Sequence, residues 1–273
     1  MSGRGIEKAV ILAAGLGTRM RKADGAAPLD PEQAAAADTG VKAMIPIGRP
    51  FLDYVISALA DSGIRDICLV IGPAHDAIRD YYASISPRRV RVRFAVQPRP
   101  LGTADAVLAA EDFAAGEDFL VVNSDNYYPV TAYAALRALD GPGLAVFDRE
   151  ILVARANIPP ARIASFALLI IDSDGFLQRI IEKPDAETMA SLAGPPFVSM
   201  NCWRFSPTIF EACRRVPLSS RGELELPQAV ANAIAEQGER FRAVPCQEGV
   251  LDLSTRADIA LVAERLRDVE VRL

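Results

Sequence analysis

Short apolar runs alternate with helix-like segments through the first half of the chain, and this alternation limits the fold most strongly. The runs Asp66–Gly72 (DICLVIG) and Asp118–Asn123 (DFLVVN) are continuously apolar, which is typical of parallel strands buried on both faces. Together with these two runs, strands are predicted at Lys8–Ala13 and Val90–Gln97, and helices at Phe51–Ser62, Asp76–Ala83 and Thr103–Asp112, the last with a threonine cap. This order predicts βαβ units and a doubly wound α/β sheet.

The second half is less regular. Strands are predicted at Ile163–Asp172, Phe176–Glu182, Phe197–Phe205 and Arg240–Val244, and helices at Pro207–Arg215, Leu226–Gln237 and Arg256–Arg267. The first two of these strands are joined by Ser173-Asp174-Gly175, a hairpin signal. Ala23–Thr39 has no strand pattern, and we interpret it as an extended loop with at most one short helical turn. No repeat or flexible linker divides the chain, so residues 1–273 are expected to form one domain.

Charge and cysteine content exclude some classes of function. The net charge of -5 argues against a protein that mainly binds nucleic acid. The segment VILAA is too short to span a membrane, and no signal-peptide layout precedes it, so we expect a cytoplasmic protein. The cysteines are scattered and expected to be buried thiols. His75 is the only histidine, which excludes a histidine-rich metal site.

The stretch AVILAAGLGTRMRK suggests an anion site, because a glycine-bearing loop follows directly on a strand. Gly15 and Gly17 let backbone N–H groups approach phosphate oxygens, and Arg19 adds a permanent cation. Ligands bind at the carboxyl ends of strands in open α/β sheets, which is where this loop lies. The plain alternative is a tight turn with a surface arginine. A Rossmann fingerprint is excluded because position 20 is Met, and a P-loop because its lysine signature is absent.

Further polar residues follow other predicted strands. Gln97 carries a donor and an acceptor that suit the edge of a base, and Gly102 would leave room for a flat ring. Asp125 and Asp252 each follow an apolar run and suit Mg²⁺. Glu182 could accept from sugar hydroxyls, and the neighbouring lysine could neutralise a phosphate. The plain alternative for Gln97 and Gly102 is an ordinary loop before a helix. For Asp125 it is an Asx-turn and for Asp252 a helix cap, and for Glu182 with the neighbouring lysine it is a solvated strand end.

Together these segments resemble the sugar-1-phosphate nucleotidyltransferases, also called nucleotide-sugar pyrophosphorylases. The resemblance runs from about Glu7 to about Leu266 and rests on the family order of LAAGLGTRM, VKAMIPIGRPFLDYVI, QPRPLGTADAV, VVNSDN, RIASFALLIIDSDGFLQRIIEKP, RGELELPQAV and GVLDLSTRADI. It implies a nucleotide-diphospho-sugar transferase (Rossmann-like) fold, with a central mixed, mostly parallel sheet flanked by helices. It also implies a nucleotide-binding half at about 1–150 and a sugar-binding half at about 151–273.

The resemblance also implies roles for single residues. Arg19, Lys42 and Lys183 match catalytic cations. The implied nucleotide-binding residues are Ala14, Gly15, Gly17, Thr18, Gln97, Gly102 and Thr103. Glu182, Lys183 and Asn201 match sugar-phosphate contacts, and Asp125 with Asp252 would hold the Mg²⁺ cofactor. The implied reaction joins an NTP, expected to be UTP or dTTP, to a hexose-1-phosphate and releases pyrophosphate.

Three features depart from the family pattern. The link from Arg19 to Lys42 is longer than usual, so Ala23–Thr39 is an insertion, which we expect to order over bound nucleotide. Arg49-Pro50 replaces the commoner lysine-proline, and Phe166-Ala167 lacks the glycine near the sugar. Two rival functions stay open: a cytidylyltransferase acting on a non-sugar phosphate, and a nucleotide-sugar-binding regulatory subunit that does not react. The sequence also leaves open a homo-oligomer.

Overall fold

The computed structural model describes residues 5–25, 27–182, 184 and 197–273. The elements of the first half are β1 (Lys8–Leu12), α1 (Thr18–Arg21), α2 (Pro31–Thr39), η1 (Lys42–Met44), α3 (Phe51–Ser62), β2 (Asp66–Ile71), α4 (Asp76–Ile85), β3 (Arg91–Val96), α5 (Thr103–Leu108), α6 (Glu111–Ala114), β4 (Phe119–Asn123), β5 (Asn126–Tyr127), α7 (Val130–Arg137) and β6 (Gly143–Asp148). Those of the second half are α8 (Arg149–Arg155), α9 (Pro160–Ile163), β7 (Leu168–Ile171), β8 (Leu177–Ile181), β9 (Phe197–Phe205), α11 (Ile209–Arg214), α12 (Leu226–Gln237), β10 (Arg242–Cys246), β11 (Leu251–Asp252) and α13 (Arg256–Leu266).

The main sheet has the strand order β10-β6-β9-β4-β1-β2-β3, with the β7–β8 hairpin attached to β9. Strands β4, β1, β2 and β3 are parallel, and β6 is parallel to β10. Strand β9 runs antiparallel between β4 and β6, which makes the sheet mixed. The predicted mixed, mostly parallel sheet is therefore confirmed, and β1 lies near its centre.

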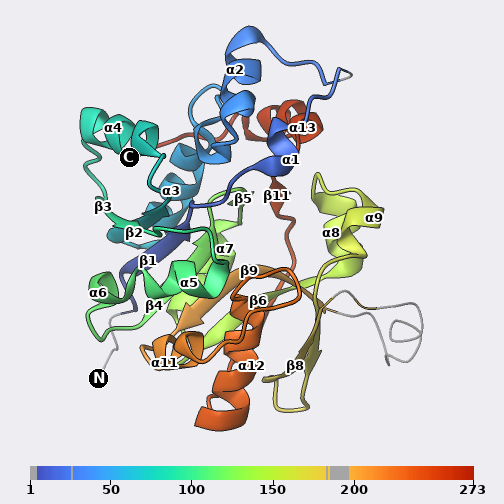
Figure 1. Cartoon of the computed structure of the whole chain (residues 1–273). Helices are drawn as coiled ribbons and strands as arrows, with labels where there is room; N and C mark the ends of the chain where they lie inside the picture. The colour runs from blue at the N-terminus through green and yellow to red at the C-terminus, as the bar shows by residue number, and fades with distance from the viewer. Residues whose placement is uncertain (1–4, 26, 183, 185–196) are drawn as a thin grey trace.

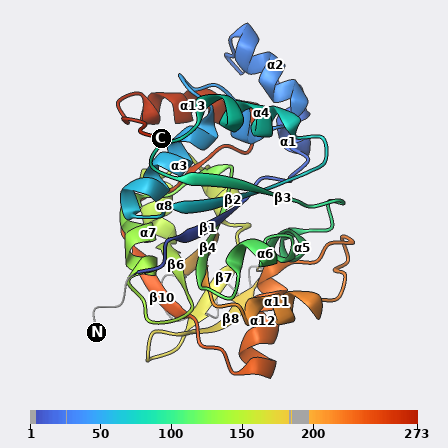
Figure 2. The ribbon, with the colours of Figure 1, turned by 90° about the vertical axis from the view of Figure 1, so that its left-hand side faces the viewer.

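Helices cover both faces of the sheet. Alternating residues of β1 separate two cores, with Ala9 and Ile11 in one and Val10 in the other. The first core includes α3, α7 and α13, and the second includes α5, α11 and α12. Figure 2 shows these two layers on opposite sides of the strands. Burial of continuous apolar strands between two helical layers is what the DICLVIG and DFLVVN runs predict.

Several predicted elements differ from the structure. Ala23–Thr39 contains the nine-residue helix α2, so the interpretation as an extended loop is wrong. The Asp30 side chain accepts a hydrogen bond from Gln33 N, and the Gln33 side chain accepts one from the backbone N–H of Asp30. A proline occupies the first turn. This capping box starts the helix although its side chains have little apolar surface. The helix lies at the upper end of the molecule, above α1 (Figure 1).

Two further boundaries are corrected. The strand predicted from Ile163 starts only at Leu168, because the preceding Pro160–Ile163 forms helix α9 with proline in its first turn. Thr103 is not the cap of α5; Gly102 occupies that position, and the Thr103 hydroxyl accepts a bond from Leu226 N instead. The predicted helix Thr103–Asp112 is interrupted between α5 and α6.

The cysteines behave as predicted. All four are free and buried. Burial raises the pKa of the Cys68 and Cys213 thiols to about 12, so these thiols stay protonated at neutral pH. No helix in the described part of the chain is long and apolar enough to cross a membrane.

Candidate active site

The loop after β1 presents unpaired backbone donors. Within the described chain, the N–H groups of Ala14, Gly15, Leu16 and Gly17 donate to no protein acceptor, whereas Ala13 N donates to Val70 O. Successive unpaired N–H groups of this kind form an anion-binding concavity. The loop after β1 therefore has backbone donors that no described protein group uses.

The two glycines of this loop have different environments. Gly17 adopts a φ of +60°, and a Cβ there would lie 2.0 Å from Gly40 O, so the loop is packed against the end of α2. A Cβ on Gly15 would meet nothing within 4 Å. Gly17 is thus required by the fold, whereas Gly15 leaves an open approach to the backbone.

One cavity of about 390 Å³ gathers most of the predicted nucleotide site. The sequence-predicted residues among its lining are Ala14, Gly15, Gly17, Thr18, Lys42, Gln97, Gly102, Thr103 and Asp125. They come from four separate segments of the chain, which include loops and the first residues of α1, η1 and α5. Arg19 is exposed on α1 and does not line the cavity.

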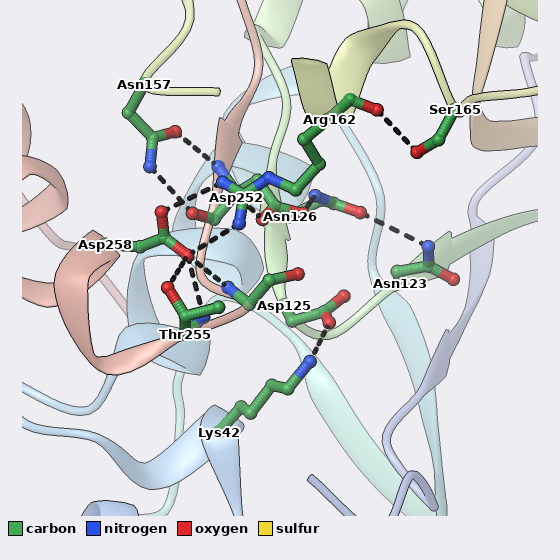
Figure 3. A network of polar contacts seen from close by, with 11 residues as sticks. Lys42, Asn123, Asp125, Asn126, Asn157, Arg162, Ser165, Asp252, Thr255 and Asp258 are labelled. Atoms are coloured by element: carbon green, nitrogen blue, oxygen red, sulfur yellow. Dashed lines mark hydrogen bonds and ion pairs between the residues drawn. The ribbon is translucent and has the colours of Figure 1, made fainter. Parts of the chain in front are cut away.

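The two predicted magnesium carboxylates are neighbours in space. Strand β11 pairs with β5, which puts Asp252 opposite Asn126, and Leu253 N donates to Asp125 O at 2.8 Å. Asp125 Oδ2 accepts from Lys42 Nζ at 2.7 Å. Figure 3 shows Lys42, Asp125 and Asp252 in this cluster. Residues separated by more than a hundred positions are thus brought together by one short antiparallel pair.

A set of polar groups holds Asp252. The Asn157 side chain bonds both backbone groups of Asp252, accepting from its N at 2.7 Å and donating to its O at 2.8 Å. Asn126 Nδ2 donates to Asp252 Oδ2 at 3.1 Å. The Arg162 guanidinium makes a paired contact with Asp258, at 2.9 and 3.0 Å, and its Nη2 lies 3.3 Å from Asp252 Oδ1. The carboxylate is therefore fixed from several sides (Figure 3).

One oxygen of the Asp252 carboxylate has an ion-pair partner but no hydrogen bond within the described chain. Its buried Oδ1 accepts no hydrogen bond from the described residues. Burial, and then the charge of Asp125, raises the pKa of Asp252 above its ordinary value. A divalent cation would satisfy this oxygen and relieve the repulsion between the two carboxylates, and oxygen ligands suit Mg²⁺. The two carboxylates can therefore supply oxygen ligands to such a cation. The described residues hold no group of three or more His, Cys, Asp and Glu side chains that could hold a metal ion.

The region of Gln97 differs in detail from the prediction. Gln97 Nε2 donates to Gly102 O at 2.9 Å and to Asp105 Oδ2 at 2.8 Å. A Cβ on Gly102, whose φ is +111°, would lie 2.5 Å from Leu224 O. The glycine is therefore required by the close approach of the Leu224 backbone, which pairs with Leu101 and Ala104, and it also lines the cavity.

The described sugar-side residues, Glu182 and Asn201, are not in this cavity lining. Glu182 follows β8 with an exposed side chain, and its charge acts on Arg221. Asn201 lies on β9 with a φ of +57°, and its Oδ1 accepts from Trp203 Nε1 at 3.4 Å. Lys183 lies outside the described residues. Ala167 is buried in the sheet, and its O accepts from Ser199 N at 3.0 Å.

Sequence reasoning missed several residues of the site. Asp105, Asn157, Arg162 and Asp258 act on Gln97 and Asp252 from other segments, and Glu223 lines the cavity. Asp105 lies within the quoted QPRPLGTADAV segment, eight positions after Gln97, and could have been considered as its partner. Nothing local in the sequence connects Asn157 or Arg162 with Asp252.

Comparisons with known proteins agree with this geometry. The family model described as nucleotidyl transferase matches residues 8–249. The chain is 30% identical over 224 residues to a glucose-1-phosphate thymidylyltransferase of Streptomyces griseus, covering 82% of this chain and 56% of that protein. It is 27% identical over 264 residues to the UTP–glucose-1-phosphate uridylyltransferase AglF of Haloferax volcanii, covering 96% of this chain and 97% of AglF.

Solved structures show the same fold. A UDP-glucose pyrophosphorylase complexed with UDP-glucose superposes with a TM-score of 0.74 at 16% identity, covering 97% of this chain and 100% of that one. A UDP-glucose pyrophosphorylase from Acinetobacter baumannii gives 0.73 at 20% identity, covering 97% and 95%. The expected nucleotide-diphospho-sugar transferase fold is confirmed.

The loop, the carboxylate pair and the family match lead to one assignment: the chain belongs to the nucleotidyl transferase family. Within it, the relatives named above confirm the resemblance to the sugar-1-phosphate nucleotidyltransferases. The chain spans little more than half the length of some curated relatives, including 56% of the Streptomyces griseus protein.

Proposed function

We propose that this chain transfers a nucleotidyl group from UTP or dTTP to a hexose-1-phosphate and releases pyrophosphate. The observation that carries the proposal is a single cavity in which unpaired backbone donors meet Lys42 and Asp125, with Asp252 beside them. The printed activities of the Streptomyces griseus and Haloferax volcanii relatives support the choice of substrates.

The proposed reaction needs positioning and charge more than proton transfer. An oxygen of the sugar phosphate attacks the α-phosphorus, a new P–O bond forms, and the bond to the oxygen bridging the α- and β-phosphorus atoms breaks. The attacking oxygen is already anionic, so no general base is required. The loop donors hold the triphosphate, while Arg19, Lys42 and Lys183 neutralise the gathered negative charge.

Asp125 and Asp252 would hold Mg²⁺ at this site. The cation supplies positive charge that shields the phosphates from the incoming anion. The chain itself positions Asp252 for the cation. Asn157 holds the Asp252 backbone and Asn126 holds Oδ2, while Oδ1 is left without a hydrogen bond from the described residues.

The sugar side remains part of the proposal. Glu182, Lys183 and Asn201 are assigned to the sugar phosphate on the resemblance, within a sugar-binding half at about 151–273 that faces a nucleotide-binding half at about 1–150. We also infer a cytoplasmic location, supported by four free cysteines. Cell fractionation tests the location, and light scattering tests for a homo-oligomer.

The experiment is a pyrophosphate-release assay with ATP, CTP, GTP, UTP and dTTP, each with a panel of sugar-1-phosphates. Mass spectrometry identifies the nucleotide-sugar. We expect turnover with UTP or dTTP and a hexose-1-phosphate, abolished by Asp125→Asn. The matched control is Asp112→Asn, since Asp112 is exposed and outside the cavity.

Other outcomes contradict the proposal in distinct ways. Turnover of CTP with a polyol phosphate or phosphocholine, and none with sugar phosphates, establishes the cytidylyltransferase instead. Tight nucleotide-sugar binding without pyrophosphate release under any condition establishes the regulatory subunit.

A further inference from the structure

The side chain of Gln97 is held by two hydrogen bonds that use the same nitrogen. Nε2 donates to the backbone O of Gly102 at 2.9 Å and to Oδ2 of Asp105 at 2.8 Å. Gln97 is buried, with 4% of its surface exposed, and it lines the cavity. The Asp105 carboxylate has no other partner in the described chain, so its contact with Gln97 is its visible role.

The chemistry of the two partners fixes which way this amide faces. A backbone carbonyl and an ionised carboxylate can only accept hydrogen bonds. The amide nitrogen must therefore face both, since a flipped Gln97 would set its own oxygen against two other oxygens. Both hydrogens of the Gln97 side-chain nitrogen are used in these two hydrogen bonds. Oε1 is then the polar side-chain atom left for a ligand.

The position of Gln97 in the cavity indicates which part of a nucleotide would meet it. The unpaired donors of the loop at Ala14 to Gly17 line one part of the cavity, and Gln97 lines it from the loop after β3 together with Pro100 and Ala106. If the loop donors hold the phosphates, the base is left for this other part of the cavity.

We propose that Asp105 determines the choice of base by holding the Gln97 amide so that only its oxygen faces the base. An acceptor at this point selects a pyrimidine that presents an N–H. Uracil and thymine carry a hydrogen on N3, whereas the N3 of cytosine is an acceptor and would oppose Oε1. Asp105 is then a positioning residue that favours UTP and dTTP over CTP without touching the nucleotide.

This inference rests on the proposed function. The same experiment can also test a competing role for Asp105, which is to stabilise helix α5. Asp105 lies in the first turn of α5, where a negative charge stabilises a helix. Asp105→Asn removes that charge but keeps an acceptor for Gln97 Nε2. Asp105→Ala removes both.

The experiment measures kcat/KM for UTP and CTP, and their binding by calorimetry, in the wild type and three variants. Asp105→Ala should reduce the ratio of UTP to CTP by about tenfold, since the second hydrogen bond that fixes the amide is lost. Asp105→Asn should keep most of the ratio. Asp112→Ala, an exposed control on the next helix, should keep all of it.

The outcomes separate the inference from the function beneath it. If the wild type turns over UTP and Asp105→Ala keeps the same ratio, the inference is wrong and the proposed function stands. If Asp105→Asn and Asp105→Ala lose equal selectivity, Asp105 acts through charge and not through the amide. If neither the wild type nor any variant releases pyrophosphate, calorimetry still tests the inference. Equal binding of UTP and CTP by a correctly folded wild type would show that the site does not select between these bases.

Discussion

At the scale of single residues, Gly15 and Gly17 of the loop after β1 are glycines for different reasons, one related to ligand approach and the other to folding. Gly17 has a left-handed backbone and touches Gly40, while Gly15 faces open space. The same residue type is therefore needed for two physical reasons within three positions. A side chain at either position should have a different consequence.

We expect Gly17→Ala to lower stability and Gly15→Ala to lower nucleotide affinity. The first places a Cβ in the left-handed region, which costs about 1–2 kcal/mol, and adds an overlap with Gly40 O. The second meets no protein atom but narrows the approach to the loop donors. Thermal denaturation and UTP calorimetry distinguish them, and an equal loss of stability in both variants would contradict the assignment.

Asp252 is a second residue whose environment predicts a measurable effect. Its folded pKa is raised by burial and by the charge of Asp125. A carboxyl whose pKa is higher in the folded state destabilises the fold as pH rises from the ordinary value of about 3.8 through the raised value. Ionised Asp252 therefore carries a cost in the metal-free protein at neutral pH.

We expect Asp252→Asn to be at least as stable as the wild type at pH 7 in EDTA. Well below the ordinary pKa of about 3.8, where the carboxyl is protonated in both states, this charge-dependent difference should vanish. Added Mg²⁺ should raise the Tm of the wild type at pH 7 and leave the variant unchanged. A Mg²⁺ response of equal size in the variant would show that Asp252 is not a ligand.

At the scale of elements, α2 shows how a sequence with little apolar surface is held in place. Arg21 donates to Thr39 O from both Nε and Nη2, and Gln33 Nε2 donates to Pro46 O. Buried Arg256 of α13 donates to Met20 O at 3.0 Å and pairs with Asp38. Helix α2 is thus tied to α1, which directly follows the loop after β1.

We expect Arg256→Ala to increase hydrogen exchange in α1 and α2 and to lower stability by about 1–3 kcal/mol, because buried acceptors lose their donor. Asp38→Ala is the matched control. It removes only the exposed end of the ion pair, which is worth less than about 1 kcal/mol. Exchange in α2 that is as fast in the wild type as in Arg256→Ala would instead support a segment that orders only over nucleotide.

At the scale of the whole molecule, a late segment of the chain completes a site begun near the N-terminus. β11 pairs with β5 on one side, and on its other side Asn157 bonds the backbone of Asp252 across 95 positions of sequence. A two-residue strand has few hydrogen bonds of its own, so this side chain replaces a missing neighbouring strand. Helices α8 and α9 both lie to the right of β11 in Figure 1, and Asn157 is in the connection between these two helices.

We expect Asn157→Ala to weaken metal binding several-fold without changing the charge of the site. Mn²⁺ titration followed by electron paramagnetic resonance measures this directly, independently of turnover. Asn232→Ala on α12 is a control, since among the described residues its side chain bonds only to Gln228 on the same helix. Unchanged Mn²⁺ affinity in Asn157→Ala would show that β5 alone positions Asp252.

The sequence by itself determined the elements whose signals are local. The bounds of α3, β9 and α12 agree with the predicted Phe51–Ser62, Phe197–Phe205 and Leu226–Gln237, because hydrophobic period and burial coincide there. The order of the seven quoted segments was enough to identify the family. The strand β6 was missed, as its apolar run is short and follows a Gly-Pro-Gly turn.

Only the tertiary structure decided how the functional side chains meet. Lys42 with Asp125, Asp105 with Gln97, and Asn157 with Asp252 are contacts between segments that are distant or lie on different elements. Their geometry depends on strand order and on the two-residue β5–β11 pair, and contacts between distant segments leave no periodic pattern in the sequence. Residue types could therefore suggest the chemistry, but only the folded backbone could determine which donor faces which acceptor.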